Sequence, residues 1–337
     1  MNRLKLCGAI TSLLLLCWWP LASNALVIGA NYGAGWNLDA KNAFFFAENT
    51  IANQLPTRYE GETIVIDTSW QALLNNDGTP NTNTLGFSSL TFPFYWWANF
   101  GSTWSGYQPG TWYPSALANH LHGSDISSAS EMSITFNSNY PNWYFGTDGN
   151  TGGKVDFPWV AMHEITHGLG FYNLLDQNGG YTLFDSLGNP IDTPLPSISD
   201  RFLAADNGHG EIQALTDMTQ EERTLAVVSG EVYWEGESGT AANGGNAPLI
   251  YAPSSFSAGS SLSHLDQSTF PDTLMRPFYY NASGAATPTH FLSATELGML
   301  RDIGWIPEPS SLILFLSGLA ILIVVLTHPN TRYPVHA

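Results

Sequence analysis

His163, Glu164 and His167 are the residues whose types and spacing point most directly to chemistry, in the stretch HEITHGLGF. On an α-helix the two histidines lie one turn apart on the same side, so both imidazoles can bind one Zn²⁺ ion. Glu164 is rotated by roughly 100° from His163 and therefore lies beside the ion. There its carboxylate can accept a proton from a zinc-activated water and deliver it to a leaving amine. The motif predicts zinc-dependent peptide hydrolysis with Glu164 as the base.

A third ligand has to come from elsewhere, because a catalytic zinc site usually takes three protein ligands. Cysteine is excluded, since Cys7 and Cys17 are the only cysteines and both lie in the first 25 residues. The rest of the chain therefore has no disulfide either. Five further histidines precede the C-terminal tail and are candidates for the third nitrogen: His120, His122, His209, His264 and His290.

Two segments together resemble the leishmanolysin branch of the metzincin zinc proteases, namely 163–171 and SHLDQSTFPDTLM at 263–275. Metzincins turn the chain at the glycine that corresponds to Gly170. Most then have the third His ligand at the position of Asn173, whose neutral amide is a poor ligand. The leishmanolysin branch instead inserts a long segment between this glycine and the third His. The resemblance implies zinc ligands His163, His167 and His264, an insertion over 171–263, and Met275 as the methionine of the turn beneath the metal.

The chain also departs from the family pattern. Leu265 replaces the usual Trp, and the cysteine pairs of eukaryotic leishmanolysins are absent. Pro277 stands where several metzincins have a Tyr that stabilises the transition state, and Tyr279 and Tyr280 are the candidates for that role. The ending SATELGMLRDIGW resembles the closing helix of such proteases.

Two other interpretations stay open. A gluzincin takes a Glu as third ligand from a downstream helix, and Glu221 and Glu222 lie on one, although the Asn-Glu signature is missing. Alternatively, the chain is a non-catalytic surface or matrix protein with a structural or vestigial zinc site, which would have no use for Glu164. A serine hydrolase is not supported, because no G-x-S-x-G motif occurs.

Capping residues and apolar periodicity predict the elements that position these side chains. Asp156 and Pro158 are typical of a helix start and predict a helix to about residue 169. Thr219 with Glu222 and Ser293 with Glu296 are capping boxes that predict two more helices. Further helices are predicted over 39–55, capped by Asp39, and over 115–122, and strands over 63–67, 132–136, 232–236 and 248–252.

The order of these elements predicts one α+β domain over residues 26–305. An early helix and strands precede the central helix, and a loop-rich half follows it. Combined with the resemblance, this implies a metzincin-like zinc protease domain of two lobes with the active-site helix between them.

Both ends of the chain carry targeting signals. Residues 1–25 are typical of a secretory signal peptide, with Arg3 and Lys5 before an apolar run and a small-residue cleavage site at 23–25. Residues 306–337 contain Pro-Glu-Pro, an apolar run over about 311–326 that predicts a transmembrane segment just long enough for a bilayer, and Arg332. This order resembles the PEP-CTERM sorting signals of Gram-negative bacteria. It implies export, processing by an exosortase-like enzyme at the inner membrane, and delivery to the cell surface, matrix or medium.

The acidic composition limits the partners. The chain has 28 Asp and Glu against 10 Lys and Arg, a net charge of −18. Nucleic acids and anionic membranes are therefore poor partners, because binding their phosphates requires clustered Lys and Arg. Proteins or peptides are the expected substrates. Asp148 opens the best calcium-like loop, but Trp159 stands at the twelfth position, where a calcium-binding hand has Glu. Ca²⁺ thus has no motif to support it, and only an irregular cation site stays open.

Overall fold

The computed structural model describes residues 25–75, 77–89, 96–97, 104–183, 194–280, 284 and 288–307. The predicted signal peptide lies outside these residues except for residue 25, and the predicted sorting tail does so from residue 308 on. Within the described ranges, no helix has both the length and the apolar character that crossing a membrane requires. Helices and several sheets are combined in a way that is compatible with the predicted α+β class.

A four-stranded sheet with the order β1-β2-β6-β3 dominates the first half of the chain. β1 (Val27–Tyr32), β2 (Thr63–Gln71) and β6 (Met132–Asn137) are parallel to one another. β3 (Gly86–Ser89) is an edge strand and runs antiparallel to β6. In β6 the alternate apolar side chains are fully buried, because one face of the sheet packs against helices.

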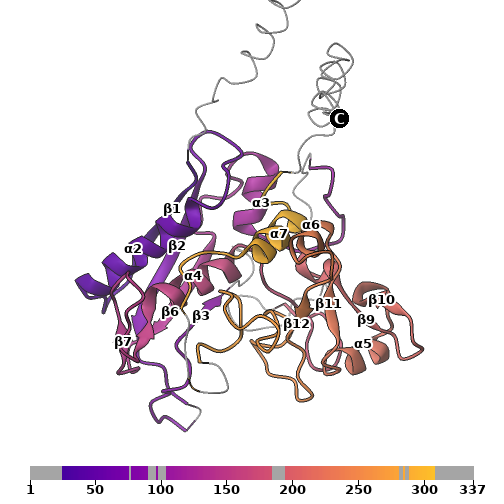
Figure 1. The fold of residues 1–337 in the computed structure, drawn as a ribbon. Helices are drawn as coiled ribbons and strands as arrows, with labels where there is room; N and C mark the ends of the chain where they lie inside the picture. Colours follow the sequence, from indigo (N-terminus) through magenta and orange to yellow (C-terminus); the bar gives the residue numbers. More distant parts are fainter. Residues whose placement is uncertain are drawn as a thin grey trace, which may run out of the picture.

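Two helices cover this sheet. α2 (Leu38–Ala52) packs against β1 and α4 (Phe157–Gly168), and α4 also contacts β6 and β3. Phe157, the first residue of α4, has its ring centre 4.8 Å from that of Phe136 and 5.4 Å from that of Trp70. Figure 1 shows α4 at the centre of the molecule, between the N-terminal sheet and the C-terminal strands. The sheet therefore supports the helix that carries the HEITH motif.

Asn37 caps α2, so the prediction of Asp39 as the cap is wrong. The Asn37 side chain accepts a hydrogen bond from the Ala40 N–H at 2.8 Å, and the helix begins at Leu38. Asn and Asp are equally good caps, but Asp39 already lies in the first turn, where its charge favours the helix N-terminus.

The second half of the chain contains a four-stranded antiparallel sheet with the order β10-β9-β11-β12. Its strands are β9 (Leu203–Asp206), β10 (Ile212–Ala214), β11 (Val232–Trp234) and β12 (Leu249–Ile250). The last two correspond to predicted strands, and both are shorter than predicted. α5 (Gln220–Ala226) begins with the predicted capping box, in which both hydrogen bonds are present.

α6 (Glu237–Ala242) and α7 (Ala294–Ile303) pack against each other. α7 has the predicted capping box of Ser293 and Glu296. α6 was not predicted, and it is capped from α7: Asp302 accepts from the backbone N–H groups of the second and third residues of α6 at 2.7 and 2.9 Å. The remaining elements are α3 (Ser115–His122), β4 (Trp96–Trp97), β5 (Tyr113–Pro114), β7 (Trp143–Tyr144), β8 (Val155–Asp156) and two short 3₁₀ helices, η1 (Ser199–Phe202) and η2 (Leu215–Asp217).

Trp305, two residues after α7, connects the end of the described chain to the end of α4. Its side chain is fully buried and its ring lies 4.7 Å from that of His120, centre to centre. The indole N–H donates to the carbonyl of Leu169 at 2.6 Å, and Leu169 caps the C-terminal end of α4. Trp305 therefore holds the end of the central helix.

A chain that ends at Ile306 should remain folded, whereas a chain that ends at Ile303 should be strongly destabilised. The shorter chain lacks Trp305, and losing a buried Trp costs about 3–5 kcal/mol, which lowers Tm by roughly 10 °C in a domain of this size. Thermal unfolding of the two truncated proteins measures the difference. Equal Tm values would mean that Trp305 does not stabilise the end of α4.

Candidate metal centre

α4 places His163 and His167 one turn apart in the middle of the molecule. The helix begins as predicted: the Asp156 carboxylate accepts from the Trp159 N–H at 2.9 Å, and Pro158 lies in the first turn. Every residue of α4 is buried. The packing of both halves of the chain around the helix therefore fixes the direction of its side chains.

Gly170 reverses the chain just after α4. Its φ is +114°, in the region that favours glycine, and a Cβ at this position would lie 3.2 Å from Ile303 and from Pro114. Beyond the turn, the carbonyl of Phe171 accepts a hydrogen bond from Nδ1 of His167 at 2.7 Å. The turn thus brings the backbone back to orient the second histidine.

His264 reaches α4 from the segment that follows β12. The Tyr251 N–H donates to the carbonyl of His264 at 2.9 Å, and the Leu262 N–H donates to the carbonyl of Tyr251 at 2.8 Å. Leu262 has a φ of 68°, the one positive value among the described residues other than glycine. Strain of this kind persists where the surroundings hold it and is common at functional sites. Here it accompanies the turn that directs His264 toward the helix.

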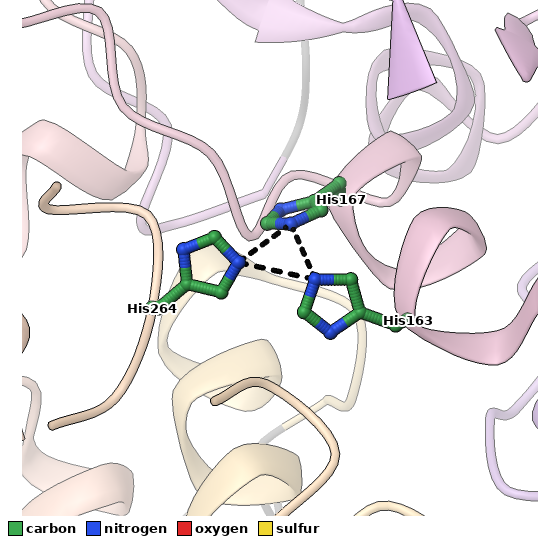
Figure 2. A group of neighbouring side chains, drawn as sticks. All are labelled: His163, His167 and His264. Carbon is green, nitrogen blue, oxygen red and sulfur yellow. Dashed lines mark hydrogen bonds between the residues drawn. The ribbon is translucent and has the colours of Figure 1, made fainter. Parts of the chain in front are cut away.

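The three imidazoles point at one another (Figure 2). Their Nε2 atoms are 3.1, 3.2 and 3.1 Å apart. Each Nδ1 lies 2.7–2.8 Å from a backbone carbonyl oxygen, which can only accept, so each Nδ1 carries the proton. A neutral ring protonated at Nδ1 has a lone pair at Nε2. The acceptors for His163, His167 and His264 are the carbonyls of Leu274, Phe171 and Ser260.

Three converging lone pairs form a site that suits a cation. A hydrogen bond between two of these Nε2 atoms would require one ring to become a buried imidazolium. Burial opposes this: it lowers the pKa of His163 far below its usual value, that of His167 to about 4 and that of His264 to about 3. A metal ion instead accepts all three lone pairs. The three buried histidines lie close enough to bind one.

Glu296 connects α7 to this site. One of its carboxylate oxygens accepts from the Ser293 N–H at 2.6 Å and completes the helix cap, and the other accepts from the Met275 N–H at 2.6 Å. The adjacent carbonyl of Leu274 accepts from Nδ1 of His163. Glu296 therefore orients a ligand histidine through one peptide unit, in the manner of groups that surround metal ligands. Met275 is fully buried and contributes its backbone to this chain of contacts.

A cleft of about 760 Å³ opens at the histidines, and its lining includes residues of β3 and residues 277–280. Glu164 lines the same cleft and is 7% exposed. The Ser88 N–H of β3 donates to its carboxylate. Burial raises the pKa of Glu164 to about 8, and the Ser88 N–H opposes that rise. Burial thus favours the protonated form of this carboxyl, which lies beside the histidine cluster.

Asn173 and the two glutamates of α5 are not part of the cluster. The Asn173 side chain donates to the carboxylate of Asp200 at 3.1 Å, and its backbone N–H donates to the hydroxyl of Ser263 at 3.2 Å. Glu222 completes the cap of α5, and neither it nor Glu221 approaches the histidines.

The other four candidate histidines lie elsewhere. Nδ1 of His120 is 2.7 Å from the buried carboxylate of Glu62, and Nε2 of His290 is 3.0 Å from that of Asp156. Over the ranges that the structure describes, only the cluster around α4 has the geometry of a metal site. The other two candidate histidines, His122 and His209, are exposed.

The two tyrosines considered for transition-state stabilisation are engaged at the start of α4. The Tyr279 hydroxyl accepts from the Asp156 N–H at 3.0 Å and lies 3.3 Å from the carbonyl of Lys154. The Tyr280 hydroxyl lies 3.3 Å from the carbonyl of Gly153, while its side chain lines the cleft. The Tyr279 hydroxyl is therefore committed to holding the loop before α4.

Several contacts at the site come from residues that the sequence analysis did not single out. Ser88 and Leu274 act through a backbone N–H and a backbone carbonyl, which leave no signal in the side chains. Glu296 was recognised as a helix cap, but its second hydrogen bond, to Met275, depends on how α7 packs. No local pattern could have indicated it.

Comparisons with known proteins add one relative. No family model matches the chain, and no solved structure matches it. An uncharacterized protein of Schizosaccharomyces pombe is 29% identical over 227 residues. The match covers 50% of this chain and 39% of the yeast protein, so the chain spans well under half of that relative's length. The chain is similar to part of a yeast protein whose name states no activity.

Proposed function

We propose that the chain is a zinc-dependent endopeptidase that hydrolyses peptide bonds with Glu164 as the general base. The observation that carries this proposal is the convergence of three neutral imidazoles and one carboxyl in a single cleft. A structural metal site has no use for a carboxyl that lines a cleft beside the ligands. Its presence favours catalysis over the alternative of a structural or vestigial site.

Zinc fits this donor set. Zn–N bonds of about 2.0–2.1 Å in a tetrahedral site separate the ligand nitrogens by about 3.3–3.4 Å, and the nitrogens lie 3.1–3.2 Å apart. Three histidines with one open position are typical of catalytic rather than structural zinc. When bound, the ion lowers the pKa of a coordinated water and polarises the substrate carbonyl.

Glu164 is the group that transfers the proton during hydrolysis. Its carboxylate takes a proton from the attacking water and delivers it to the leaving nitrogen of the peptide. The carboxylate is held for this by its place on the buried helix α4 and by the Ser88 N–H. His163, His167 and His264 keep their Nε2 lone pairs directed inward through their Nδ1 hydrogen bonds, so the site needs no rearrangement before substrate arrives.

The edge strand β3 is suited to pairing with an extended peptide. The carbonyl of Leu85 accepts from Asn137 in β6, whereas the Ser88 N–H points to Glu164. Backbone groups alternate in direction along an antiparallel strand, so those of Gly86 and Ser88 face away from β6. A substrate strand added at this edge would pass the histidines, which is a recurring mode of peptide recognition.

The proposal includes a family and a location. The central position of α4 between two sheets, the turn at Gly170 and the return of His264 after a long insertion support a leishmanolysin-like metzincin of two lobes. The signal peptide and sorting tail that the sequence predicts support export and delivery to the surface, matrix or medium, with processing by an exosortase-like enzyme. On this proposal, deleting 307–337 yields a soluble, active enzyme.

Hydrolysis of a fluorescently labelled casein by the purified full-length chain tests the function. We expect cleavage that stops when 1,10-phenanthroline removes the metal and returns when Zn²⁺, but not Ca²⁺, is added back. Cleavage that persists without metal would contradict the mechanism. A zinc-loaded, folded chain that cleaves neither casein nor a mixed peptide library would favour the non-catalytic alternative.

A further inference from the structure

Arg276, the residue after Met275, is a buried guanidinium inside a loop. It is 1% exposed, among the least exposed large side chains of the described chain. Its Nε donates to the carbonyl of Phe278 at 3.0 Å, and Nη2 donates to the carbonyl of Tyr279 at 2.9 Å. Nη1 donates to the carbonyl of Pro271. One side chain therefore connects the backbone before Met275 with the backbone after it.

The backbone that Arg276 binds is one wall of the cleft. Residues 277–280 line the cleft, and so do residues of β3. Phe278 in this wall is 50% exposed, and Phe87 in β3 is 43% exposed. Two exposed aromatic side chains in the lining of one cleft mark a contact surface for apolar groups. The position of the 277–280 backbone therefore sets the space available to a substrate side chain.

The same guanidinium also lies over a ring that supports a metal ligand. Its central carbon is 5.0 Å from the ring centre of Trp159. Trp159 in turn stacks on His163 with ring centres 5.1 Å apart and planes at 25°. Arg276 thus contacts both the wall of the cleft and the ring packed against the first histidine. A planar fork of five N–H donors suits this task, whereas an ammonium group donates from a single atom.

We propose that Arg276 is a positioning residue that fixes the 277–280 wall and thereby determines which substrate side chain fits beside the scissile bond. The selectivity part rests on the proposed peptidase function, and the positioning part does not. Arg276→Lys keeps the positive charge near Trp159 but cannot reach three carbonyls in three directions. The wall should loosen, while the three histidines keep their backbone acceptors.

Arg223 is a matched control within the same chain. Its guanidinium donates to the carbonyls of Gly179, Met218 and Leu215 and lies 5.0 Å from the ring centre of Tyr181. The contacts have the same form as those of Arg276, but none of these residues lines the cleft. Arg223 is half-buried, and Arg223→Lys removes a set of contacts of the same kind without touching the wall.

The wall itself can be probed without any peptidase activity. Residues 278–280 are all aromatic, so a loosened wall offers cutting sites to added chymotrypsin. In a full-length Glu164→Gln background, which prevents self-cleavage, Arg276→Lys should be cut at 278–280 at least tenfold faster than the parent, by mass spectrometry of the fragments. Arg223→Lys should be cut there at the parental rate. Equal rates in all three proteins would overturn the positioning role, whether or not the chain is a peptidase.

Selectivity is measured with Glu164 intact, on two peptides that differ only by Leu or Ala next to the cleaved bond. One extra or missing methylene in an apolar pocket changes kcat/KM by about 10–200-fold. We expect the ratio of kcat/KM values to fall by about tenfold or more in Arg276→Lys, at one zinc per chain, and to be unchanged in Arg223→Lys. An unchanged ratio in Arg276→Lys would overturn the selectivity role. A parent that cleaves no peptide would refute the proposed function, and the chymotrypsin rates would still decide the positioning role.

Discussion

Glu164→Gln should abolish peptide hydrolysis and leave the metal in place. Gln has nearly the same shape and can still accept the Ser88 N–H, but it cannot take a proton from water at neutral pH. Loss of a general base lowers the rate by roughly 10²–10⁴-fold. The measurements are kcat/KM on labelled casein and zinc per chain by elemental analysis.

Glu221→Gln is the control for this experiment, because Glu221 is an exposed carboxylate outside the cleft. It should retain both the activity and the zinc of the parent. If the Glu164→Gln protein cleaved casein at the parental rate, Glu164 would not be the base. If it lost its zinc as well, the carboxyl would be holding the metal, which the three-histidine site does not require.

His264→Ala should release the metal, whereas Asn173→Ala should keep it. Removing His264 leaves two nitrogen donors, and even losses outside the ligand set weaken metal binding by about 10–100-fold. Removing the Asn173 amide takes one hydrogen bond from Asp200, which lowers stability by about 1–3 kcal/mol but alters no ligand. After dialysis against a mild chelator, we expect zinc near zero per chain in the first variant and near one in the second.

His209→Ala completes this set, because His209 is exposed and outside the cluster, and it should behave like the parent. A zinc-replete His264→Ala protein beside a zinc-free Asn173→Ala protein would refute the ligand assignment. Peptidase activity should follow the zinc content in the His264→Ala, Asn173→Ala and His209→Ala proteins, since all three keep Glu164.

The features that sequence reasoning anticipated are those decided within a few residues. The caps of α4, α5 and α7 are Asp156, Thr219 and Ser293, and each bonds to a backbone N–H three residues on. Asn37 and Asp39 show the limit of such reasoning, because two good caps two residues apart cannot be ranked locally. The spacing of His163 and His167 on one helix follows from helix geometry alone.

What sequence reasoning missed depends on contacts between distant segments. α6 has two glycine or serine residues in six and is held by Asp302, more than sixty residues away. β1 was not predicted, because its pattern is neither alternating nor continuously apolar and its place beside β2 is decided by the sheet. The third histidine was selected among five by resemblance, since nothing in its own spacing connects it to α4.

The three Nδ1 hydrogen bonds have a consequence for how the chain folds. These hydrogen bonds direct three Nε2 lone pairs toward one another. Without an ion between them, the lone pairs repel one another in the folded chain. An ion that binds only the folded chain stabilises it by RT ln(1 + [L]/Kd), about 2.7 kcal/mol at one hundred times Kd. Folding and metal uptake are therefore one linked equilibrium. In a metal-poor setting the chain lacks this stabilisation, so the fraction of folded chain reports how much free ion surrounds it.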